Sequence, residues 1–68
     1  MKLFVNEKEI ILFEGATVTD ALRMYNATAL DDVKAGKAEV LDAYGNIVAL
    51  DGALYEGNRL FFRKQKTN

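Results

Sequence analysis

Alternating apolar and polar residues at the start of the chain predict a β-hairpin. Residues 2–6 (KLFVN) and 9–13 (EIILF) are rich in β-branched and aromatic side chains, and a short polar run lies between them. Two runs of this kind joined by a polar turn are typical of paired antiparallel strands. Because side chains alternate between the two faces of a strand, Leu3 and Val5 are expected on one face and Phe4 on the other.

The apolar spacing changes after Gly15, where the main helix is predicted. Thr17 can cap this helix, and Asp20 stands three residues further on, which is an aspartate form of the capping box. The helix is expected to end near Asn26. The apolar stripe, spaced at i, i+3, i+4 and i+7, consists of Val18, Ala21, Leu22 and Tyr25.

The same start signal occurs again and predicts a second, shorter helix of about two turns. Thr28 is followed three residues later by Asp31. Leu30 and Val33 supply the apolar pair of this helix. Gly36 suits the position just after the helix C-terminus.

Three further strands are predicted in the second half of the chain. Residues 38–42 (AEVLD) and 47–50 (IVAL) flank a Tyr-Gly-Asn turn and suggest a second hairpin. Residues 59–64 (RLFFRK) form the last predicted strand. Residues 65–68 (QKTN) are polar and are expected to be a flexible tail.

The order of these elements predicts a single α+β domain over residues 1–64. It matches the β-grasp arrangement, in which a mixed sheet of four to five strands packs on one main helix, here with a short second helix. The chain has 68 residues, of which 50% are hydrophobic and 28% are charged, and this is the composition of one globular domain.

Several stretches also resemble the ubiquitin-like β-grasp superfamily. The opening MKLFV is similar to the start of ubiquitin. The stretch from Met1 to Leu22 resembles the ThiS/MoaD sulfur carriers of thiamine and molybdopterin synthesis. The stretch AEVLDAYGNIVALDGALYEGNRLFF resembles the same carriers and also the TGS domains of some synthetases and GTPases. The resemblance covers about residues 1–64 and implies a ubiquitin-like fold.

One feature of the sulfur carriers does not occur in this sequence. The resemblance implies a C-terminal Gly-Gly, whose carboxylate is adenylated and converted to a thiocarboxylate. None of the five glycines here is adjacent to another, so no carrier residue is assigned. A sulfur carrier, or a degenerate relative that docks on an adenylating enzyme without being activated, stays an alternative function.

Composition argues against an enzyme. The chain has no histidine and no cysteine, which removes the commonest general base and every thiolate site. Asp31 and Asp32 stand where a helix begins, a favourable place for acids, and Asp51 belongs to a turn. A domain of this kind is also expected to lack a cleft of about 300 Å³, the usual lower limit for ligand sites. We therefore expect no enzymatic activity, catalytic residue, metal site or cofactor.

Charge is distributed unevenly along the chain. Residues 1–56 carry five basic and ten acidic side chains, whereas residues 57–68 carry four basic and none acidic, for a net charge of −1. The resemblance to TGS domains implies an RNA- or nucleotide-contacting module as a second alternative. Four charges are a weak signal, so nucleic acid is not the expected partner. The candidate phosphate contacts are Arg59, Arg63, Lys64 and Lys66.

Charged side chains interrupt the apolar stretches of the sequence. The first fifteen residues already contain two lysines and three glutamates. No apolar run reaches the length of a signal peptide or of a membrane-spanning helix. We therefore expect a cytoplasmic protein without a membrane partner.

The sheet face away from the main helix is predicted to carry apolar side chains. In the β-grasp arrangement the first strand lies between the second and the last. If Leu60 and Phe62 face the helix, Phe61 faces outward. Phe4, Ile11 and Phe61 are then expected to be cross-strand neighbours. An exposed apolar area of a few hundred Å² marks interaction sites on soluble proteins.

The register of the second strand decides which of its side chains join this face. With Ile10 and Leu12 facing inward, Ile11 and Phe13 face outward, and a shift of one residue exchanges the two pairs. Either register leaves an apolar face. We therefore predict a non-enzymatic protein-binding module whose partner is another protein or a second copy in a homodimer. The candidate interface residues are Phe4, Ile11, Phe13 and Phe61.

Overall fold

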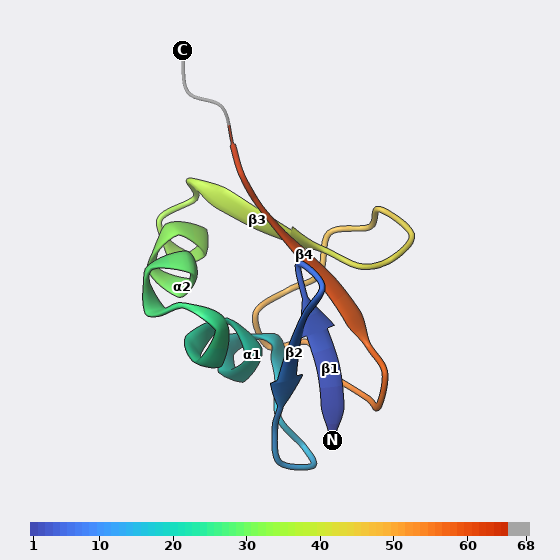
Figure 1. Cartoon of the computed structure of the whole chain (residues 1–68). Coiled ribbons are helices and arrows are strands. Elements are labelled where there is room, and N and C mark those ends of the chain that lie inside the picture. The colour runs from blue at the N-terminus through green and yellow to red at the C-terminus, as the bar shows by residue number, and fades with distance from the viewer. Residues whose placement is uncertain (66–68) are drawn as a thin grey trace.

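The computed structural model describes residues 1–65, which form a layer of strands and a layer of helices (Figure 1). The elements are β1 (Lys2–Val5), β2 (Lys8–Ile11), α1 (Val18–Tyr25), α2 (Ala27–Lys34), β3 (Ala38–Leu41) and β4 (Arg59–Lys64). α1 packs against β1 and β2, and α2 packs against β3. The fold is therefore α+β, as the sequence predicts.

The sheet is mixed and has its two central strands in parallel. The strand order is β2-β1-β4-β3. β1 and β4 run parallel to each other, and the two outer pairs are antiparallel. The first strand consequently lies between the second and the last, as expected.

A two-residue turn fixes the register of the first hairpin. Asn6 and Glu7 both have left-handed backbone angles, with φ of 49° and 67°, and turns of this kind suit the twist of paired strands. Leu3 lies opposite Ile10, and both are buried. Leu12 is buried as well. The inward-facing residues are therefore the ones predicted, although the second strand ends two residues earlier than expected.

The main helix begins where the capping signal predicts. The Asp20 carboxylate accepts a hydrogen bond from the Thr17 backbone N–H at 2.9 Å, which satisfies a donor at the helix start. The helix ends at Tyr25, and Asn26 follows in extended conformation. The buried members of the predicted apolar stripe are Val18, Ala21 and Leu22.

The second helix starts earlier than expected, because a different residue caps it. The Asn26 side-chain oxygen accepts from the Thr28 backbone N–H at 2.9 Å, so Asn26 and not Thr28 is the N-cap. The predicted pair of Thr28 and Asp31 therefore lies inside the helix. Leu30 is buried, and Gly36 follows the helix with a φ of 77°, as its position predicts.

The strand predicted over residues 47–50 does not form. This segment makes an isolated bridge between Leu41 and Ile47 and then leaves the sheet. Leu50 accepts from the Thr19 backbone N–H at 2.9 Å, so the chain turns towards the start of α1 instead of continuing beside β3. The first N–H groups of a helix have no partner within the helix. The N–H of Thr19 binds the Leu50 carbonyl, so this segment follows the helix start and does not form a strand beside β3.

The core lies between the two layers. Its buried members come from all four strands, from both helices and from the loop before α1. The three largest fully buried side chains, Leu3, Leu22 and Leu60, have at most 1% of their surface exposed. Within residues 1–65, no helix is long and apolar enough to span a bilayer.

Candidate functional site

The face of the sheet opposite the helices is not covered by another element of the described chain. Phe4 from β1 and Phe61 from β4 lie on this outer face, because their neighbours Val5 and Leu60 point into the core. Both phenylalanines are half-buried. The other side chains that alternation places on this face are Lys2, Glu9, Ile11, Glu39, Leu41, Arg59 and Arg63.

Phe4 has charged side chains on both sides. It lies opposite Glu9 on β2 and beside Arg59 on β4. The Arg59 guanidinium carbon lies 4.9 Å from the centre of the Phe4 ring, a cation–π contact. The sequence suggested that Ile11 and Phe61 are direct cross-strand neighbours of Phe4. In the structure they instead occupy positions diagonal to Phe4 on the two adjacent strands.

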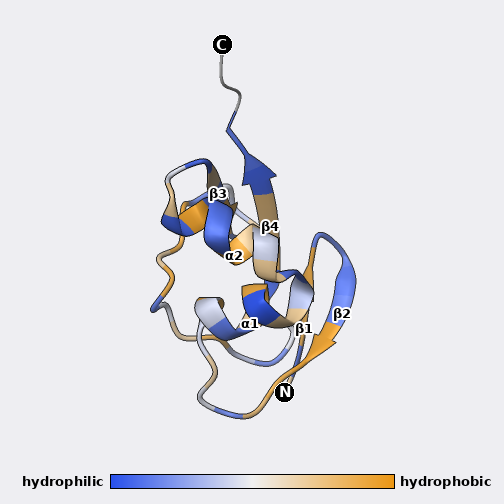
Figure 2. Ribbon diagram, turned by 90° about the vertical axis from the view of Figure 1, so that its left-hand side faces the viewer, coloured by the Kyte–Doolittle hydropathy of each residue, from blue (hydrophilic) through white to orange (hydrophobic). Residues whose placement is uncertain are grey.

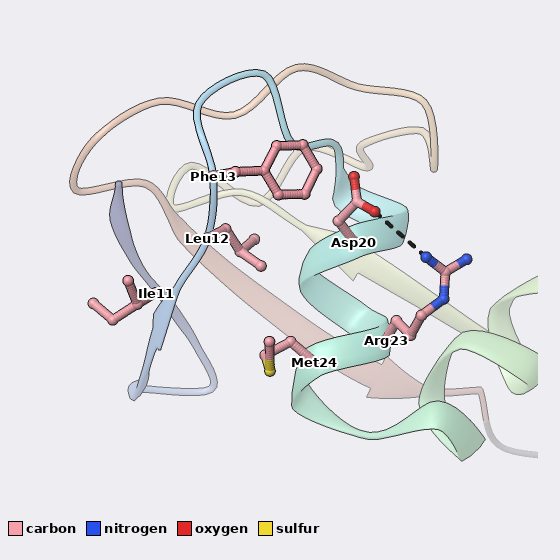
Figure 3. A pocket seen from close by; sticks show the side chains of 6 residues that line it. All are labelled: Ile11, Leu12, Phe13, Asp20, Arg23 and Met24. Carbon is pink, nitrogen blue, oxygen red and sulfur yellow. Dashed lines mark hydrogen bonds and ion pairs between the residues drawn. The ribbon is translucent and has the colours of Figure 1, made fainter.

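The remaining two candidate anchors lie at the edge of the sheet. Ile11 ends β2 and is 60% exposed, and Phe13 follows in the loop and is 63% exposed. Figure 2 shows apolar colouring along this end of β2 and the segment after it. Because the strand has ended, Phe13 no longer follows the alternation and its ring points towards α1 (Figure 3). The four predicted anchors thus fall into two groups.

An open groove of about 620 Å³ lies between the β2 edge and α1 (Figure 3). The expectation that the domain lacks a cleft of ligand size is therefore wrong. The groove contains a side chain that sequence reasoning missed, Met24, which is 60% exposed. The sequence did contain a signal for Met24, because it is an apolar residue on the predicted helix that lies outside the apolar stripe. The groove is lined by Ile11, Leu12, Phe13, Asp20, Arg23 and Met24.

One end of the groove is charged. The Arg23 guanidinium lies 3.4 Å from the Asp20 carboxylate, three residues earlier on the same helix. The Asp20 carboxylate also holds the helix start through Thr17. The pair therefore borders the groove with one positive and one negative group, while the walls formed by β2 and Met24 are apolar.

The three basic residues near the end of the described chain, Arg59, Arg63 and Lys64, do not converge on one site. Arg59 covers Phe4, Arg63 contacts the Glu39 carboxylate at 2.6 Å, and Lys64 lies 3.6 Å from Asp32. Arg63 and Glu39 share the outer face, whereas Asp32 belongs to α2 on the opposite side. The fourth predicted phosphate contact, Lys66, lies outside the described residues.

The acidic residues show no arrangement suited to a metal. Within residues 1–65, no three acidic side chains come together in a way that could hold an ion. Asp42 instead organises a turn, in which its Oδ1 accepts from the Asn46 N–H at 2.9 Å and the Tyr44 N–H at 2.8 Å. The hydrogen bond from the Asn46 backbone, followed by those from Tyr44 and the Asn46 side chain, lowers the pKa of the Asp42 carboxyl.

The surface features of the domain are thus an outer face with half-buried aromatic side chains and a groove with exposed apolar ones. Neither contains a nucleophile with a neighbouring base, the minimum for covalent catalysis. A scan against protein-family models and searches of curated proteins and of solved structures find nothing that matches this chain.

Proposed function

We propose that this protein is a non-enzymatic protein-binding module that contacts its partner through the outer face of the sheet. The observation that carries the proposal is the placement of Phe4 and Phe61 on the face that the helices leave uncovered. The outer face of a sheet in a small domain ordinarily carries polar residues. Aromatic side chains on this face bury large areas when a partner covers them.

The charged residues around the two phenylalanines fit this role. Protein interfaces combine an apolar centre with a polar rim, and aromatic residues and arginine are enriched in them. Here Arg59 lies over Phe4, and the ion pair of Arg63 with Glu39 lies towards the β3 side of the face. Ile11, on the β2 side, extends the same face as an exposed apolar side chain.

We further propose that the fold is a β-grasp of the ubiquitin-like kind. Support comes from the parallel pairing of β1 with β4 at the centre of the sheet and from α1, which packs against β1 and β2. This assignment favours the same surface, because it leaves a single uncovered sheet face for recognition.

The test is the recovery of binding partners by two charge-matched variants. Phe4→Glu/Phe61→Glu places two acids in the centre of the outer face. Ala27→Glu/Thr28→Glu adds the same two charges at exposed positions of α2, on the opposite side of the sheet. Each protein is immobilised and exposed to a lysate of its native source, and bound proteins are identified by mass spectrometry. Circular dichroism confirms that every variant is folded.

We expect a partner that the wild type and the control variant retain and the outer-face variant loses. Equal recovery by all three proteins would contradict the proposal. A partner retained by the outer-face variant but weakened steeply by salt would instead favour phosphate contact by the basic residues. An adenylating enzyme among the lost partners would favour the alternative of a degenerate sulfur carrier.

A further inference from the structure

We draw no further inference here: the strongest candidate, the open apolar groove between the β2 edge and α1, where Ile11, Phe13 and Met24 are exposed, is an unpartnered surface, and nothing in the structure shows what covers it.

Discussion

The side-chain amide of Asn6 pairs with both backbone polar groups of Phe62, a residue 56 positions later in the chain. Its Oδ1 accepts from the Phe62 N–H at 2.9 Å, and its Nδ2 donates to the Phe62 carbonyl at 3.3 Å. The Asn6 backbone N–H donates to the Leu60 carbonyl at 2.9 Å. The side chain thus continues the ladder between β1 and β4 past the point where the β1 backbone turns away.

Replacement of Asn6 by alanine should destabilise the fold by about 2 kcal/mol. The variant loses two hydrogen bonds to β4, each contributing about 1 kcal/mol, and places alanine at a φ of 49° that asparagine tolerates better. Asn6→Asp keeps the acceptor and should lose about half as much. Urea denaturation at neutral pH measures both. An alanine variant within about 0.5 kcal/mol of wild type would contradict this prediction.

Glycine in place of Glu7 should raise the free energy of unfolding by about 0.5–1 kcal/mol. The side chain is exposed and has a φ of 67°, a region that costs a non-glycine residue about 1–2 kcal/mol. Glycine removes this strain but gains unfolded-state entropy, which offsets part of the benefit. Glu7→Ala keeps the strain and serves as the control. A thermal melt in which both variants behave alike would show that the turn is not strained.

The Asp42 turn should stabilise the fold less at low pH. Its folded-state pKa lies below the ordinary value of 3.8, so its contribution is present above that value and declines as the pH falls through the folded pKa. Asp42→Asn cannot titrate there, so the stability difference between wild type and variant should shrink from pH 7 to about pH 3. Chemical-shift titration of the Asp42 carboxyl should give a midpoint below 3.8. A midpoint at or above it would refute this.

The contact between Arg59 and Phe4 should couple the two side chains by about 0.5–1 kcal/mol, the range for exposed cation–π pairs. A double-mutant cycle with Phe4→Leu and Arg59→Gln, followed by urea denaturation, isolates this coupling from the other effects of each change. High salt should reduce it only slightly, because the two groups lie 4.9 Å apart, well inside the screening length. A coupling of zero would mean that Arg59 is available to a partner instead.

The positions of the helices and of the core strands could be predicted from sequence, because each signal is local. Thr17 and Asp20 lie within one helical turn, and the alternation around Leu3 is a property of one strand. The second helix start was misjudged because Asn26 ends one helix and caps the next. A single residue with two roles leaves no separate start signal.

The parts that could not be predicted depend on contacts between distant segments. Residues 47–50 have the composition of a strand, but the Thr19 backbone N–H donates a hydrogen bond to the Leu50 carbonyl. No local sequence pattern reveals this contact. The position of Phe13 in the candidate site could not be predicted either. Phe13 was expected on the sheet face by alternation, whereas the early end of β2 directs it to the groove with Met24.

The parallel pairing of β1 with β4 has a consequence for how the chain is made and folded. Contacts between segments so distant in sequence form slowly, because a long loop must close before they can form. During synthesis the first hairpin and α1 emerge from the ribosome well before β4, so β1 remains without its parallel partner strand during that time. Until then the side of β1 that will bind β4 is an open strand edge. The emerging chain is therefore most prone to aggregation before its last strand leaves the ribosome.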